Sequence, residues 1–267
     1  MHRTLVSLAA LVLLACRHTT APDPAEMAIQ AEPAVAAVDA GVPLADHDWL
    51  EPVGDDAREL AKVSVPLGAT TQRPVMIGLH GAGDRAEWSC GEWRGVTHAF
   101  PFVVCPRGDR SGYYYDAPKA TQADLQLAIG EVRNRFAGWV GPHDPELLAG
   151  FSMGATEAIA LLIQTDLRAP SLALVEGGYE SLAFAGVPGL LAARGVRRVL
   201  LACTTLGYCP THYAAAKQGL ERAGIAVHFI QAARRDHGMY PEVTEALAKE
   251  WPWLSAGRAG WESLPPP

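Results

Sequence analysis

The 267-residue sequence lacks the marks of several protein classes. It has no run of Lys and Arg that could follow a phosphate backbone, and its formal net charge is −7, so we expect no nucleic-acid partner. No C-x-x-C pair is present, which argues against a zinc ribbon or a thioredoxin-like redox site. The spacing of the His residues matches no metal-ligand pattern, so we expect neither a metal nor a cofactor.

A hydrophobic run of membrane-spanning length is also missing near the start. Leu5 to Leu14 is apolar apart from Ser7, and it is too short to cross a bilayer, which needs about 20 residues. Its length and the preceding basic residue are typical of a secretory signal covering residues 1–15. The run ends in Leu-Leu-Ala-Cys16, which resembles the lipobox of bacterial lipoproteins. The resemblance implies cleavage before Cys16 and acylation of that residue, for example with palmitate.

Such a protein would be anchored by lipid to a bacterial membrane, in the cell envelope, and would face the periplasm or the exterior. The alternative is an ordinary secretory signal that happens to contain a Cys. Residues 16–47 are rich in Ala and Pro and lack an aromatic residue, so they are predicted to form a tether that does not fold by itself. Residues 48–260 show no internal repeat and no clear break, which predicts one domain. Residues 261–267 end in three Pro and are predicted to form a disordered tail.

Within the predicted domain, short apolar runs alternate with helical patterns. Short apolar runs bounded by turn residues are typical of strands buried on both faces. Strands are predicted at residues 74–80, 100–105, 147–151, 172–175, 199–203 and 225–230, with an edge strand at 60–66. Helices are predicted at residues 121–136, 154–164, 211–223 and 241–251. The alternation predicts an α/β fold with a mostly parallel central sheet and helices on both faces.

One motif indicates covalent chemistry. Residues 150–154 read Gly-Phe-Ser-Met-Gly and fit the pattern G-x-S-x-G, directly after a predicted strand and before a predicted helix. The glycines leave room for a sharp turn that raises the hydroxyl of Ser152 above the sheet. The same turn places the amide of Met153 near the positive end of the helix.

A serine hydroxyl needs a base to act as a nucleophile. His237 follows the last predicted strand, in the sequence Asp236-His237-Gly238, where α/β sheets place their sites. His212, after the fifth predicted parallel strand, is the second candidate. The sequence His80-Gly81-Ala82-Gly83 follows the first parallel strand and is predicted to form an oxyanion hole, with the Ala82 amide and the Met153 amide as donors. A plain glycine turn is the alternative.

These motifs together resemble the α/β-hydrolase superfamily over residues 73–252, and most of all its dienelactone-hydrolase, esterase and polyester-depolymerase types with little or no lid. The resemblance implies a serine hydrolase that cleaves small or polymeric carboxylic esters through an acyl-serine intermediate. A peptidase or a thioesterase would use the same residues. The competing hypothesis is a non-catalytic envelope lipoprotein that uses the fold as a binding or scaffold module.

The sequence departs from the family at the triad acid. The family usually has this acid in the loop after the fifth parallel strand, but residues 204–212 contain neither Asp nor Glu. Glu176, at the end of the fourth strand, needs a partner for its charge and is one candidate for the acid. Asp236 and a Ser–His dyad are the other options.

The four cysteines of the domain are predicted to form disulfides, because an exported protein meets an oxidising environment. Cys203 and Cys209 bracket the loop without an acid, and Cys90 and Cys105 are the other two. Four cysteines allow three connectivities, so the sequence leaves the pairing open. Trp88, Trp93 and residues 113–115, which are three Tyr, either line a substrate pocket or pack under loops.

Overall fold

A computed structural model describes residues 42–55, 57–205, 207–232 and 236–265. The predicted signal, the lipidation residue Cys16 and most of the tether lie outside these residues. The described residues belong to one compact unit. They include no helix of the length and apolar character needed to cross a membrane.

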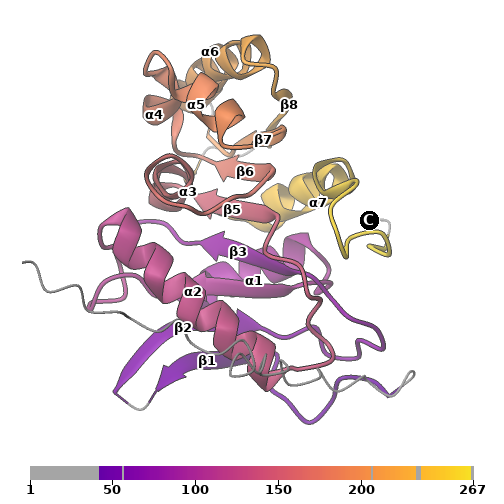
Figure 1. Cartoon of the computed structure of the whole chain (residues 1–267). Coiled ribbons are helices and arrows are strands. Elements are labelled where there is room, and N and C mark those ends of the chain that lie inside the picture. Colours follow the sequence, from indigo (N-terminus) through magenta and orange to yellow (C-terminus); the bar gives the residue numbers. More distant parts are fainter. Residues whose placement is uncertain (1–41, 56, 206, 233–235, 266–267) are drawn as a thin grey trace, which may run out of the picture. The chain divides into compact units, whose positions relative to one another are not determined.

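A single eight-stranded sheet forms the centre of this unit (Figure 1). Its strands are β1 (Leu50–Asp55), β2 (Arg58–Ser64), β3 (Val75–Leu79), β4 (Phe102–Pro106), β5 (Leu147–Phe151), β6 (Ser171–Val175), β7 (Arg198–Cys203) and β8 (Ala226–Gln231). They lie in the order β1-β2-β4-β3-β5-β6-β7-β8. β1 and β2 pair as an antiparallel hairpin, and β2 pairs antiparallel with β4. All other pairs are parallel, so the carboxyl ends of six strands meet at one edge.

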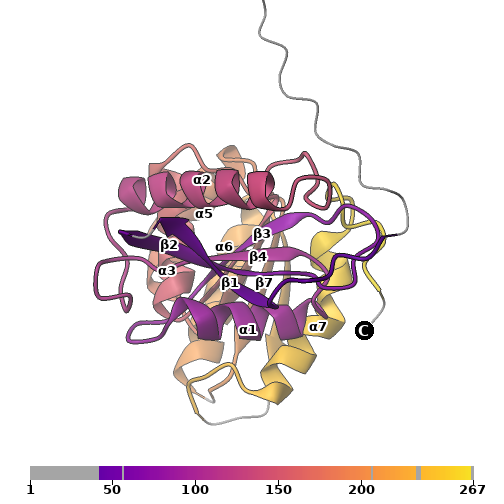
Figure 2. The ribbon, with the colours of Figure 1, turned by 90° about the horizontal axis from the view of Figure 1, so that it is seen from below.

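Helices cover both faces of this sheet. They are α1 (Ala86–Val96), α2 (Pro118–Arg135), α3 (Met153–Gln164), α4 (Tyr179–Ala183), α5 (Val187–Ala193), α6 (Tyr208–Arg222) and α7 (Pro241–Ser255). Figure 2 shows α2 on one side of the sheet and α1 and α7 on the other. Buried residues of α2 to α6 share one apolar cluster, and those of α1 and α7 share a second.

The strand sequences supply both clusters, because successive side chains point to opposite faces. In β6, Leu172 and Leu174 belong to the cluster of α2 to α6, whereas Ala173 and Val175 belong to the cluster of α1 and α7. All four side chains are fully buried. A strand with both faces covered must be apolar at every position, which is the pattern visible in the sequence.

The predicted α/β class and the mostly parallel sheet are confirmed, and each predicted parallel strand matches an observed one within two residues at either end. The predicted edge strand at 60–66 is wrong in position, because β2 lies inside the sheet and β1 forms the edge. β1 contains Pro52 and Gly54 and is only half-buried, so it lacks an apolar run. Between β6 and β7 only the short helices α4 and α5 intervene.

The folded unit extends beyond the predicted boundaries. Leu44 was expected in the tether, but it is 1% exposed, and its amide donates to the carbonyl of Ala69 at 2.8 Å. Trp261 was expected in a disordered tail, but it is 4% exposed and packs on Phe100 with ring centroids 5.7 Å apart. A single apolar side chain among polar or Pro residues forms no periodic pattern in the sequence, although it can still be buried in the core.

Replacing Leu201 with Ala is expected to lower the free energy of unfolding by about 2–5 kcal/mol, because this β7 side chain is fully buried and would leave a cavity. Leu127→Ala is the control, since Leu127 on α2 is 63% exposed, and it should change stability by less than about 0.5 kcal/mol. Urea denaturation of both variants measures the difference. Equal losses would contradict the burial described here.

Candidate active site

Ser152 lies at the sharp turn between β5 and α3, at the carboxyl edge of the sheet. Its backbone has φ 53° and ψ −117°, a conformation that a non-glycine residue adopts only under strain. The amide of Ser152 donates to the carbonyl of Val175 at 2.8 Å, which fixes the turn against β6. An added Cβ at Gly150 would lie 2.3 Å from the carbonyl oxygen of Gly154, so the turn requires a glycine there.

His237 lies opposite this serine, in the loop between β8 and α7. Its Nε2 atom is 2.9 Å from the Oγ atom of Ser152. The ring packs on the ring of Phe151, with centroids 4.8 Å apart. His212, the second candidate base, instead packs against Tyr208 in α6, with ring centroids 3.8 Å apart. The structure therefore brings His237 to the serine and places His212 in a separate aromatic cluster.

Glu176 is the third side chain of a connected series that begins with Ser152 and His237. Its Oε2 atom is 3.4 Å from the Nδ1 atom of His237. The residue directly follows β6, has φ 52° and is only 3% exposed. Because Nδ1 faces a carboxylate and Nε2 faces a hydroxyl, the arrangement suits the tautomer with the proton on Nδ1, in which Nε2 can accept the proton of Ser152. Of the two carboxylates considered, Glu176 holds this position, whereas Asp236 is exposed.

The loop after β7 supplies the hydrogen bonds of the Glu176 carboxylate. Its Oε1 atom accepts from the amide of Thr204 and, at 2.5 Å, from the amide of Thr205. The hydroxyl of Thr205 donates to both carboxylate oxygens, at 3.0 and 3.1 Å. Burial by itself would raise the pKa of Glu176, but the hydrogen bonds from His237, Thr205 and Thr204 outweigh it and lower the pKa to about 2. Glu176 is therefore ionised at neutral pH.

A disulfide and a hydrogen bond hold this loop in place. A disulfide joins Cys203, the last residue of β7, to Cys209 in the first turn of α6. The hydroxyl of Thr204 donates to the carbonyl of Asp236 at 3.0 Å, one residue before His237. Glu176, Cys203 and Cys209 lie close enough to suggest a metal site among the described residues. Because the two sulfurs are bonded to each other, neither is a thiolate ligand.

The predicted oxyanion loop lies against Ser152. An added Cβ at Gly81 would be 3.3 Å from the Cβ of Ser152, so the backbone before Ala82 lies against the serine. Among the described residues, neither the Ala82 amide nor the Met153 amide has a hydrogen-bond acceptor. These two amides, one directly after Gly81 and one directly after Ser152, fit the predicted oxyanion hole.

Tyr115 forms a hydrogen bond with the backbone of this loop. Its hydroxyl accepts from the amide of His80 at 2.6 Å. The imidazole of His80 is fully buried, and its Nδ1 atom is 2.8 Å from the carbonyl oxygen of Gly81. The loop is further fixed by the amide of Gly83, which donates to the carbonyl of Tyr113 at 3.0 Å.

No protein-family model matches the sequence. No curated protein sequence matches it significantly. Solved structures do match. A hormone-sensitive lipase from a metagenome library is 12% identical with a TM-score of 0.52, and the match covers 80% of this chain and 86% of that one. TT1662 from Thermus thermophilus is 15% identical with a TM-score of 0.52, and the match covers 78% and 98%. Acylaminoacyl peptidase from Pyrococcus horikoshii is 16% identical with a TM-score of 0.52, and the match covers 80% and 41%.

The chain has the α/β-hydrolase fold. Identities this low establish the fold alone, so the chemistry of the site must be argued from its own residues. In this α/β-hydrolase fold the candidate acid follows β6, and the loop after β7 donates hydrogen bonds to it.

Thr204 and Thr205 are the site residues that the sequence analysis missed. Their backbone amides are the main donors to Glu176, and an amide has no signature in a sequence. The available signal was indirect: a loop without an acid, between two cysteines, contains two adjacent hydroxyl residues. Such a loop can donate hydrogen bonds to a carboxylate of another segment, which here is Glu176.

The aromatic residues that could have lined a pocket divide into two groups in the α/β-hydrolase fold. Trp93 is fully buried and packs on Trp251, with ring centroids 5.9 Å apart, so it belongs to the core. Trp88 is 58% exposed, and the guanidinium of Arg85 lies 5.7 Å from its ring.

The lowered pKa of Glu176 predicts a specific acid sensitivity. Because the folded-state pKa lies below the ordinary value of 4.5, the carboxylate stabilises the fold above that value, and this contribution is lost as the pH falls towards 2. The stability difference between the wild type and Glu176→Gln should therefore shrink by up to about 3 kcal/mol between pH 5 and pH 2. Urea denaturation at several pH values measures it.

Glu245→Gln is the matched control, since Glu245 is exposed on α7. Its stability difference from the wild type should stay nearly constant over the same range. A constant difference for Glu176→Gln would show that Glu176 is not held as a charged group.

Proposed function

We propose that the chain is a serine hydrolase that cleaves carboxylic esters through an acyl-serine intermediate. The observation that carries the proposal is the connected series of Ser152, His237 and Glu176, with separations of 2.9 and 3.4 Å, at the carboxyl edge of the sheet. Nucleophile, base and orienting carboxylate are the three groups that activated serine chemistry requires.

In the proposed mechanism each residue has one step. The Oγ atom of Ser152 attacks the ester carbonyl carbon while the Nε2 atom of His237 takes its proton, and the negative charge of Glu176 stabilises the imidazolium. The amides of Ala82 and Met153 donate to the oxyanion of the tetrahedral intermediate. His237 returns the proton to the leaving alcohol oxygen, which leaves an acyl-serine.

Water then completes the reaction. His237 takes a proton from a water molecule that attacks the acyl carbon, and the second tetrahedral intermediate forms in the same oxyanion hole. Its collapse returns the proton to Ser152 and releases the carboxylic acid. His237 is half-exposed, so water can reach it without a movement of the fold.

The non-catalytic alternative was motivated by the missing acid after β7. The position of Glu176 supports the enzyme instead, because a buried, ionised carboxylate facing the base supplies what that loop lacks. The same residues would serve a peptidase or a thioesterase, and the structural neighbours include both a lipase and a peptidase. The open site, without a long insertion between β6 and β7, favours small or polymeric esters.

We also propose that the enzyme is anchored in a bacterial cell envelope by a lipid on Cys16. The support comes from the sequence Leu-Leu-Ala-Cys and from the two disulfides, which suit an oxidising compartment. The anchor would keep the enzyme at a membrane, with the residues up to about 43 between the lipid and the folded unit.

A fluorophosphonate probe is expected to label the folded protein, because the activated Oγ atom of Ser152 attacks phosphorus as it would a carbonyl carbon. Ser152→Ala should abolish labelling and reduce hydrolysis of p-nitrophenyl acetate by at least about 1,000-fold. Mass spectrometry of the labelled peptide and a spectrophotometric assay measure both. The proposal fails if the folded wild type is not labelled while a known esterase is labelled alongside.

The two disulfides are expected to affect different properties. Replacing Cys203 and Cys209 with Ser should lower kcat by about tenfold or more, because the Thr204 and Thr205 amides would no longer be held against Glu176. Cys90 in α1 and Cys105 in β4 form the second disulfide. Replacing both with Ser should mainly lower stability, since this disulfide closes the longer loop, 15 residues against 6.

Both double variants are compared at a temperature where circular dichroism shows them to be folded. The positioning role of the Cys203–Cys209 disulfide is contradicted if the two pairs lower kcat equally.

A further inference from the structure

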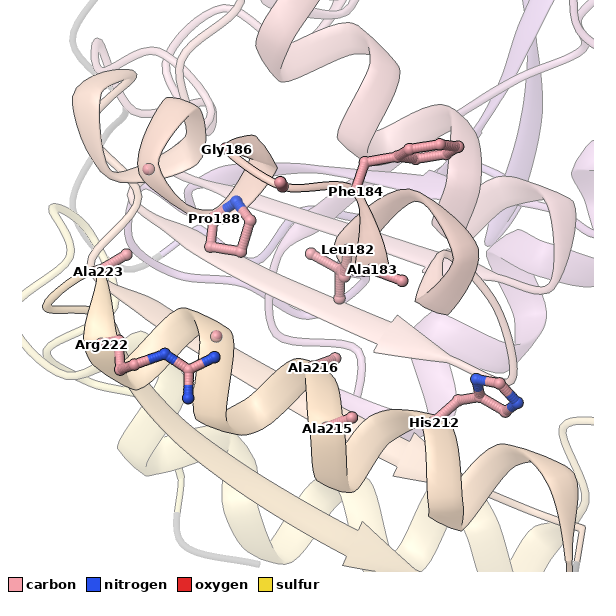
Figure 3. Close-up of a pocket in the computed structure, with 13 residues that line it drawn as sticks. Leu182, Ala183, Phe184, Gly186, Pro188, His212, Ala215, Ala216, Arg222 and Ala223 are labelled. Atoms are coloured by element: carbon pink, nitrogen blue, oxygen red, sulfur yellow. The ribbon is translucent and has the colours of Figure 1, made fainter.

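Three consecutive tyrosines, at positions 113–115, lie in the loop after β4 and have no part in the mechanism above. Figure 3 shows a groove of about 530 Å³ between α4, α5 and α6, and none of the three lines it. The residues that line this groove also include none of the proposed triad or oxyanion hole. The tyrosine segment instead contacts the predicted oxyanion loop, residues 80–83.

The hydroxyl of Tyr115 binds both backbone groups of His80. It accepts from the amide at 2.6 Å and donates to the carbonyl oxygen at 3.3 Å. The phenol ring packs on the imidazole of His80, with ring centroids 4.7 Å apart. One hydroxyl therefore holds the peptide groups on both sides of His80, and the second of these groups leads directly to Gly81.

The carbonyl group of His80 also lies against the turn of the nucleophile. An added Cβ at Gly154, in the first turn of α3, would be 2.6 Å from the carbonyl oxygen of His80. An added Cβ at Gly81 would be 3.3 Å from the Cβ of Ser152. The backbone of residues 80 and 81 is thus packed between the tyrosine hydroxyl and the nucleophile turn. A shift of this backbone would move the Ala82 amide relative to Ser152.

The loop of residues 107–115 is closed by its own hydrogen bonds. The amide of Asp109 donates to the carbonyl of Tyr114 at 2.7 Å. The Asp109 carboxylate accepts from the amides of residues 111 and 112, each at 3.0 Å. Gly108 has φ 84°, and an added Cβ there would be 2.0 Å from the carbonyl oxygen of Tyr114, so the loop requires a glycine.

Two more contacts join this closed loop to the oxyanion loop. The carbonyl of Tyr113 accepts from the amide of Gly83 at 3.0 Å. The carbonyl oxygen of Arg107 lies 3.3 Å from the Nε2 atom of the buried His80 imidazole. Both ends of the oxyanion loop, residues 80 and 83, are therefore bound to the same segment.

We propose that Tyr115 is a positioning residue whose hydroxyl holds the oxyanion loop so that the Ala82 amide faces the developing oxyanion. The inference rests on the proposed ester hydrolysis and adds to it a residue that does not touch the substrate. Donors held in place before the reaction stabilise the transition state more, because they need no reorganisation. Burial raises the pKa of Tyr115 well above its ordinary value of 10.0, so the hydroxyl keeps its proton at neutral pH.

Tyr115→Phe removes this hydroxyl and keeps the ring. The oxyanion forms in both acylation and deacylation, so both steps should become slower. We expect kcat for p-nitrophenyl acetate to fall by at least about tenfold, while KM changes by less than about twofold. Tyr113→Phe is the matched control and should have wild-type values, since the Tyr113 hydroxyl accepts from Arg85 at the surface, at 3.1 Å. Equal kcat values in the two folded variants would overturn the proposal.

Inhibition by 1,1,1-trifluoroacetone distinguishes positioning from a general loss of structure. The Oγ atom of Ser152 bonds to the ketone carbon, the carbonyl π electrons move to the oxygen, and the serine proton moves to His237. The inhibition constant should rise in Tyr115→Phe by about the factor by which kcat/KM falls. The pH at half-maximal kcat/KM, which reports the base, should stay at its wild-type value. An unchanged inhibition constant, or a shifted pH midpoint, would contradict a role in the oxyanion hole.

A second variant tests the same loop from the surface, and circular dichroism checks that each variant folds. Asp109 is partly exposed, and Asp109→Ala removes the acceptor that closes the loop. We expect kcat to fall by about threefold or more, whereas Asp109→Asn, which keeps an acceptor oxygen, should retain most of it. If Tyr115→Phe does not fold, wild-type kcat in folded Asp109→Ala would overturn the proposal.

The wild-type reaction separates this proposal from the proposed function. If the wild type hydrolyses p-nitrophenyl acetate in a Ser152-dependent manner but Tyr115→Phe behaves like Tyr113→Phe, the positioning role fails and the ester hydrolase remains. If the folded wild type neither hydrolyses this ester nor takes the fluorophosphonate label, the proposed function fails, and the positioning role fails with it.

Discussion

The buried carboxylate of Glu176 is the group on which the candidate site depends. A charge at 3% exposure is unfavourable unless it is fully hydrogen-bonded, and here two backbone amides, a hydroxyl and an imidazole satisfy it. In return it fixes which nitrogen of His237 has the proton and therefore which nitrogen faces Ser152. Without this carboxylate, the imidazole would have no defined tautomer and no partner for its charged form.

Several parts of the structure serve this one interaction. The strained turns at Ser152 and Glu176 both have positive φ, and they end the adjacent parallel strands β5 and β6. Strain of about 1–3 kcal/mol at each turn is tolerated because buried strands and the glycines around them fix the backbone. The loop after β7 has no acid of its own, and its Thr204 also binds the backbone next to His237. One loop thus binds both the candidate acid and the backbone next to the base.

The sequence could predict what depends on local patterns. Continuous apolar runs indicated the strands around the site, and the glycines at 150 and 154 indicated the turn at Ser152. The edge strand β1 and the helix α1 were not predicted, because β1 is half-buried and α1 contains two glycines, Gly91 and Gly95, which disfavour a helix. Their burial arises from contacts with β2 and α7, which only the folded chain reveals.

The acid could be narrowed to three options by sequence, and only the fold brings one of them to His237. Glu176 and His237 are 61 positions apart and meet because β6 and the loop after β8 end at the same edge of the sheet. The amides that stabilise Glu176 have no side-chain signature. Contacts of this kind depend on loop conformation, which the residue types of the loop do not determine.

In the proposed mechanism Glu176, rather than Asp236, orients the base. The rate of fluorophosphonate labelling of Ser152 tests it directly, because labelling reports the nucleophile without any assumption about the substrate. Glu176→Gln should slow labelling by about 100-fold or more, and Asp236→Asn should label at the wild-type rate. Wild-type labelling in folded Glu176→Gln, or an equal loss in Asp236→Asn, would contradict the account.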